Sequence, residues 1–106
     1  MADLPIACSL TGPELRERRE TVLAAVRARV QEVRELKSGM ALRFDPGGGV
    51  LAALAELIDL ERQCCPFLQF DLRVLPANGP VWLELTGPDG TREFLRDLLE
   101  VSPKGA

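Results

Sequence analysis

Apolar residues between positions 50 and 70 repeat with the spacing of an amphipathic helix. At about 100° per residue, one face of this helix carries Leu54, Leu57, Ile58, Glu61, Cys64 and Cys65. Pro66 disfavours a helical conformation at the residue before it, so we expect the helix to end at the two adjacent cysteines. Glu61 is the unexpected member of this face, because a buried carboxylate is costly unless it is paired, hydrogen-bonded or bound to a metal.

A second helical pattern begins after Thr11 and extends to about Val30. Thr11 can cap the first turn, which contains Pro13, and Glu14 would complete a capping box. The predicted buried stripe consists of Leu15, Val22, Val26 and Val30, with Leu23 at its border.

Arg19 projects into the same stripe, and two roles are open to it. It could pair with Glu61 across the two helices, in which case each buried charge would explain the other. Alternatively, its aliphatic part lies along apolar surface while the guanidinium reaches water.

The period changes to two in residues 33–44, which predicts a β-hairpin that turns at Ser38 and Gly39. Residues 70–74 and 81–85 predict two further strands, and a last helix follows Gly90 and continues to about Glu100. The expected fold class is α+β, ordered α-ββ-α-ββ-α, with an antiparallel sheet of about four strands and helices packed on one face. Trp82 is expected on the second face, under a loop, or in a dimer contact.

Length and composition favour a single domain over residues 1–106, with residues 1–10 as a mobile lead and residues 102–106 as a frayed tail. The chain is 46% hydrophobic and 27% charged, as in ordinary globular proteins. A net charge of −3 gives no reason to expect nucleic-acid binding by this chain alone. No segment resembles a membrane span or a signal peptide, so we expect a cytoplasmic protein without a membrane partner. A homodimer is compatible with the sequence.

The cysteine and histidine content limits the kinds of catalytic and metal sites that this chain can form. The three cysteines are an odd number and imply no disulfide framework, and the chain contains no histidine. Imidazole-based catalysis and mixed Cys/His zinc sites are therefore excluded from this chain.

A metal site is one use for these cysteines. The bend expected at Pro66 would let the thiols of Cys64 and Cys65 converge, and Cys8 could supply a third thiolate. Glu61 lies one helical turn from both cysteines and could be a ligand or a proton acceptor, while Arg62 could favour the thiolate form. Such a set suits zinc, mercury, cadmium, lead or arsenite, and no organic cofactor is expected.

Two other interpretations remain open. Free cysteines often fill apolar cores, so the chain could be a structural or partner-binding domain with buried thiols. It could also be a thiol-dependent enzyme or redox protein, with Cys64 or Cys65 as nucleophile and Glu61 as acid or base. Against this stand the missing histidine and a poor match between a carboxylate and a thiol proton at neutral pH.

The segment ERQCCPFLQFDL, followed by GPVWLELTGPDGTREFL, resembles small, largely uncharacterised bacterial proteins marked by an ERxCCPF motif. The resemblance covers nearly the whole chain and includes a CxLT segment, here Cys8-Ser9-Leu10-Thr11, before an arginine-rich helix. It implies an association with heavy-metal resistance loci and with extensions of mercury-responsive-type regulators. The positions that it makes characteristic are Cys8, Glu61, Arg62, Cys64 and Cys65.

These observations predict soft metal or metalloid binding through Cys8, Cys64, Cys65 and Glu61, supported by Arg62 and Arg19. The role would be heavy-metal sensing, buffering or resistance, and binding is preferred over catalysis.

Overall fold

The computed structural model describes residues 12–99, which form three helices and one four-stranded antiparallel sheet. The elements follow the order α1 (Pro13–Arg27), β1 (Val30–Leu36), β2 (Gly39–Phe44), α2 (Val50–Cys64), β3 (Gln69–Val74), β4 (Val81–Thr86) and α3 (Thr91–Leu99). This confirms the predicted α+β class and the order α-ββ-α-ββ-α. The expectations for residues 1–11, Cys8 and Thr11 included, and for residues 100–106 lie outside the described residues.

The sheet has the strand order β1-β2-β4-β3, so the two hairpins meet through β2 and β4. Leu42 of β2 lies opposite Leu83 of β4, and both side chains are fully buried. Residues with the same orientation form the sheet side of the core, namely Met40, Phe44, Val81 and Leu85. The alternation of apolar and polar residues along β4 therefore directs one face toward the helices.

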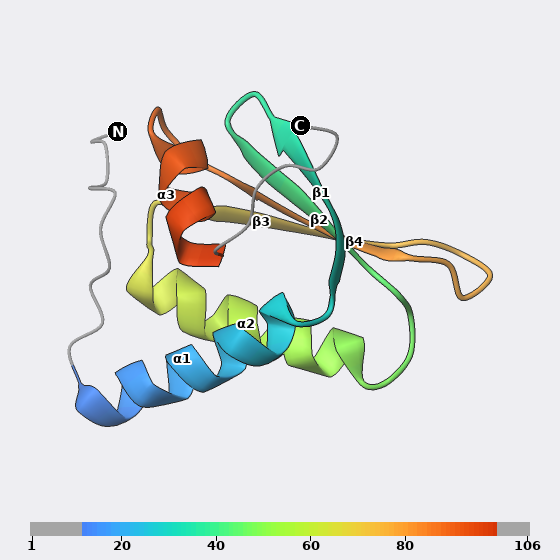
Figure 1. Ribbon diagram of the computed structural model, residues 1–106, viewed down its shortest axis with the longest axis horizontal. Coiled ribbons are helices and arrows are strands. Elements are labelled where there is room, and N and C mark those ends of the chain that lie inside the picture. The colour runs from blue at the N-terminus through green and yellow to red at the C-terminus, as the bar shows by residue number, and fades with distance from the viewer. Residues whose placement is uncertain (1–11, 100–106) are drawn as a thin grey trace.

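Helices α1 and α2 pack side by side and cover this face together with α3 (Figure 1). Leu54 and Leu57 of α2 are buried among the core residues, as are Leu23 and Val26 of α1. Trp82 points to the opposite face, where the Arg34 guanidinium lies 4.7 Å from the centre of its ring.

The first helix is shorter than predicted and is rotated. It ends at Arg27, and Val30 begins β1 opposite Phe44 instead of closing the helical stripe. Leu15, predicted to be buried, is 43% exposed, whereas Leu23 belongs to the core. Val30 fits the helical spacing of Val22 and Val26, but valine is β-branched and also favours a strand once a partner strand is present.

The start of α1 also differs from the prediction. Its N-cap is Gly12, which forms no side-chain capping hydrogen bond, and the Thr11 part of the predicted capping box lies outside the described residues. Pro13 occupies the first turn, where its missing N–H has no helical partner to lose.

Candidate metal centre

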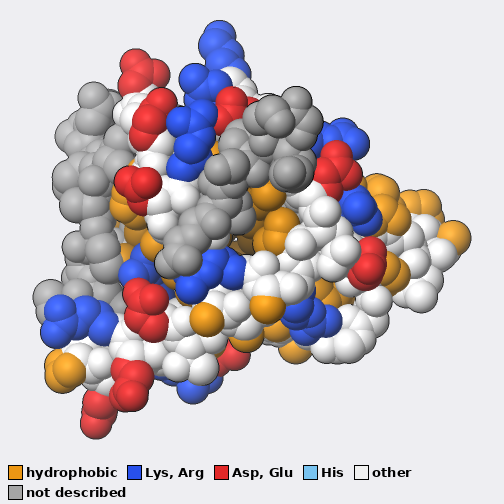
Figure 2. All heavy atoms as spheres, viewed as in Figure 1, with side chains coloured by type: hydrophobic (Ala, Val, Ile, Leu, Met, Phe, Trp, Pro, Cys, Tyr) orange, Lys and Arg blue, Asp and Glu red, His pale blue; other side chains and the backbone are white. Residues whose placement is uncertain are grey.

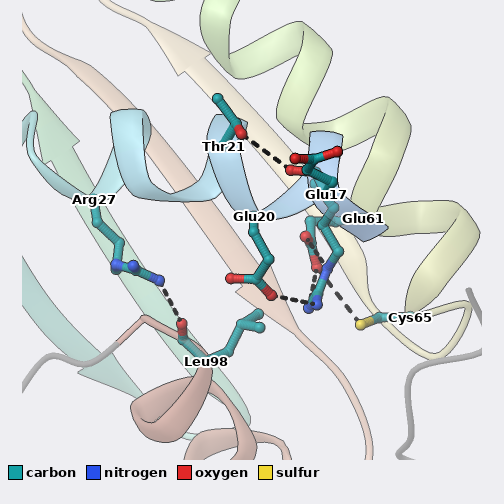
Figure 3. A network of polar contacts seen from close by, with 8 residues as sticks. Glu17, Glu20, Thr21, Arg27, Glu61, Cys65 and Leu98 are labelled. Atoms are coloured by element: carbon teal, nitrogen blue, oxygen red, sulfur yellow. Dashed lines mark hydrogen bonds and ion pairs between the residues drawn. The ribbon is translucent and has the colours of Figure 1, made fainter. Parts of the chain in front are cut away.

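Glu61 is 1% exposed although it carries a carboxyl group, and Arg19 of α1 contacts it directly. The Arg19 Nε donates to Glu61 Oε2 at 2.7 Å, and Nη2 donates to Oε1 at 3.3 Å (Figure 3). Of the two roles considered for Arg19, the structure has the ion pair. Burial opposes the charged guanidinium, but the hydrogen bond and charge of Glu61 outweigh it and raise the pKa of Arg19.

The two cysteines lie where α2 ends. Cys64 is its last residue, and Cys65 is the C-cap with φ −123° and ψ 74°, outside the helical region. This is the departure expected before Pro66. The Cys65 N–H still donates to the Glu61 backbone oxygen at 2.6 Å, so the chain leaves the helix without losing this hydrogen bond.

The segment after the cysteines is held against α3. Phe67 is buried and meets the Phe94 ring edge to face, with 5.1 Å between ring centres. The Leu68 N–H donates to the Cys65 backbone oxygen at 3.0 Å, which closes a tight turn over Pro66. These contacts hold the backbone that follows Cys65 in place.

The outcome is a buried group of three potential metal ligands from one helix end. One carboxylate oxygen of Glu61 and the sulfurs of Cys64 and Cys65 all lie within 4.8 Å of one another. All three residues are fully or almost fully buried. Such a group is close enough to hold a metal ion.

The odd number of cysteines implied no disulfide framework, yet one of the two described cysteines is in a disulfide. Cys64 is disulfide-bonded, whereas Cys65 is a free buried thiol, so the two neighbours are not joined in a vicinal ring. A disulfide sulfur lacks the thiolate charge that soft metals prefer. The group of Glu61, Cys64 and Cys65 can therefore act as a three-donor set only after Cys64 is reduced.

The Cys65 thiol is protonated at neutral pH. Burial, and next the charge of Glu61, raise its pKa from 9.0 to about 12, although Arg19 acts in the opposite direction. The Sγ donates to Glu61 Oε1 at 3.6 Å (Figure 3). Since the thiolate is the nucleophile, this environment makes Cys65 a poor catalytic cysteine, and a metal ion would have to displace its proton.

Arg62 lies away from the sulfurs. Its Nε donates to Asp59 Oδ1 at 3.2 Å, and both side chains are more than 60% exposed. The charges that shift the pKa of Cys65 are those of Glu61 and Arg19.

Glu20 is a neighbour of the site that the sequence pattern did not single out. Its Oε2 lies 3.5 Å from Arg19 Nη1, so the guanidinium lies between two carboxylates (Figure 3). The signal was present in the sequence, because Glu20 directly follows the one arginine that projects into the apolar stripe.

No family model, curated protein or solved structure matches this chain. Among the described residues, none of the helices has the length and apolar character needed to cross a membrane.

Proposed function

We propose that the reduced protein binds one soft metal or metalloid ion through Cys64, Cys65 and Glu61, and that it serves in heavy-metal sensing, buffering or resistance. The observation that carries the proposal is the buried group whose ligand atoms lie within 4.8 Å of one another. Donors around one zinc ion, with bonds of about 2.0–2.3 Å, lie roughly 4 Å apart. Small side-chain rotations would therefore bring the three donors onto one ion.

Charge balance favours a divalent ion. Two thiolates and the Glu61 carboxylate carry three negative charges, and the Arg19 guanidinium beside Glu61 carries one positive charge. A divalent cation would make the buried group neutral, which a low-dielectric site requires. Sulfur ligands select thiophilic ions such as zinc, mercury, cadmium, lead or arsenite, and Cys8 is the candidate for a third thiolate.

The redox state decides whether the ligand set exists. In a reducing cytoplasm, where we expect this chain, disulfides are rare and the Cys64 thiol would be available. The resemblance to ERxCCPF-motif proteins is the reason for preferring heavy-metal handling over a structural zinc site.

Native mass spectrometry with proton-release measurements tests the proposal. Fully reduced protein would receive Zn²⁺, Cd²⁺, Hg²⁺ or arsenite, beside the variants Cys65→Ser, Glu61→Gln and Cys8→Ser. Glu56→Gln is the matched control, because it removes an exposed carboxylate from the same helix. We expect one bound ion, protons released on binding, and affinity at least about tenfold lower in Cys65→Ser and Glu61→Gln.

The Cys8→Ser variant separates a site built on α2 alone from one completed by Cys8. Protein kept in its disulfide form should bind the ions poorly. The proposal is wrong if the reduced protein binds none of them, or if Cys65→Ser binds as tightly as the unchanged chain.

A further inference from the structure

Strand β3 (Gln69–Val74) is an edge of the sheet and is almost entirely exposed. It pairs with β4 on one side, and within residues 12–99 no strand covers its other side. Five of its six residues are exposed, and its pairing with β4 is regular, without a bulge. A regular, exposed edge presents unpaired backbone N–H and C=O groups that can join another strand.

The opposite edge of the same sheet is protected. Strand β1 has a bulge between Val30 and Glu32, and Glu32, Arg34 and Glu35 place charges along it. Bulges and charges are the devices by which natural sheets prevent association at an edge. The contrast indicates that β3, rather than β1, is the edge open to a partner.

Exposed apolar side chains lie beside the free edge. Leu72 and Val74 face the same side of the sheet as the buried Leu83 and Val81, yet they are 40% and 54% exposed. The helices therefore leave this end of the sheet uncovered, and Figure 2 shows hydrophobic side chains gathered where the β3–β4 hairpin projects. The surface consists of an open strand flanked by apolar groups.

The charges of β3 are self-complementary. Asp71 and Arg73 lie on the other face, on either side of Leu72. If two copies pair antiparallel with Leu72 opposite Leu72 of the second copy, each Asp71 faces an Arg73. The same register places Phe70 opposite Val74, an aromatic and β-branched pair that favours sheets. Registers centred on Asp71 or Arg73 would instead place like charges opposite each other, which is unfavourable.

A second copy would also reduce the repulsion between two carboxylates within each sheet. In its own sheet it lies opposite Glu84, a carboxylate of the same sign. Arg73 reaches Glu84 only at 3.9 Å and is 66% exposed. A second copy would bring another guanidinium to this acidic pair.

We propose that two copies of this chain associate through β3, antiparallel and centred on Leu72, to form a continuous eight-stranded sheet with all helices on one face. The strand contact is short, so the dimer should be weak, in the micromolar range typical of small interfaces. This inference does not depend on metal binding.

Analytical ultracentrifugation of the reduced full chain over a range of concentrations tests the proposal. Asp71→Arg and Arg73→Asp each replace two attractive pairs by two repulsive pairs, so we expect the dissociation constant to rise about tenfold or more in each variant. The double variant Asp71→Arg/Arg73→Asp restores opposite charges and should dimerise like the unchanged chain. Gln31→Arg, a charge added to the β1 edge, is the matched control and should change nothing.

A cross-link tests the register independently. Directly opposite residues of antiparallel strands lie about 4.5–5.5 Å apart at Cα, within the range of a disulfide. Leu72→Cys should therefore give a covalent dimer on mild oxidation, whereas Gln31→Cys should not. A chain that stays monomeric at every concentration refutes the proposal, as does a dimer that is insensitive to the single variants or is not restored by the double variant. Circular dichroism of each variant verifies that its fold is intact.

Discussion

Removing the guanidinium from the buried Arg19–Glu61 pair should strongly destabilise the fold. The relevant change is Arg19→Met, which keeps an unbranched side chain of similar length and removes the charge. Glu61 is 1% exposed and would keep the weak Cys65 Sγ–H donor at 3.6 Å in place of two hydrogen bonds from Arg19. Breaking a buried ion pair from one side leaves an uncompensated charge and costs about 3–5 kcal/mol.

We therefore expect Arg19→Met to lose about 3 kcal/mol of unfolding free energy, equivalent to a fall of roughly 15 °C in melting temperature. Replacing both partners, as Arg19→Met/Glu61→Leu, should return stability to within about 1 kcal/mol of the unchanged chain, because no buried charge remains. The assay is urea unfolding of reduced protein at neutral pH, followed by circular dichroism and by Trp82 fluorescence.

Arg18→Met is the control for this experiment. Arg18 lies on α1, as Arg19 does, and pairs with Glu56 of α2, but the side chains of Arg18 and Glu56 are 61% and 38% exposed. Exposed pairs contribute about 0–1 kcal/mol, so little should change. If Arg19→Met costs no more than Arg18→Met, or the double variant is as unstable as the single one, the reasoning about the buried pair is wrong.

Two further predictions concern Cys65 and the β-hairpin. Because the folded pKa of the Cys65 thiol is raised from 9.0 to about 12, its protonated form stabilises the protein below pH 9. The unfolding free energy, measured by urea titration, should therefore fall between about pH 9 and pH 12. In Cys65→Ala it should depend less on pH over this range, and an equal pH dependence in the two proteins would contradict the buried-thiol account. In Gly39→Ala the added Cβ would lie 1.8 Å from the Leu85 backbone oxygen, so we expect a loss of about 3 kcal/mol or more by urea unfolding. Gly47→Ala, where the added atom meets nothing within 4 Å and only the positive φ is strained, should cost about 1 kcal/mol, and an equal loss in the two variants would refute the steric argument.

The periodic pattern predicted α2 and its end well because both signals are local. Leu54 and Leu57 share a helical face with Glu61, and Pro66 acts on the residue directly before it. The anomaly of a carboxylate on an apolar face likewise pointed to a partner, and Arg19 was the charged residue with the matching position.

Errors arose where the outcome depends on distant segments. Val30 fits a helical repeat, and only its pairing with Phe44 in the folded sheet makes it a strand residue. The sequence made no prediction for the burial of Leu72 and Val74, because it depends on whether a helix reaches β3, and the pattern of β3 itself does not record this. The oxidation state of Cys64 is a matter of redox conditions and proximity, neither of which spacing along the chain records.

The ion pair between α1 and α2 couples the candidate metal site to the attachment of the first helix. Helix α1 packs chiefly against α2, and Arg19 holds it there through the same Glu61 oxygens that a metal ion would use. An ion that drew one of these oxygens away would weaken the attachment of a whole helix, much of whose outer face is exposed to solvent. Metal binding would thereby make α1 more mobile, and faster amide hydrogen exchange along α1 would measure this change.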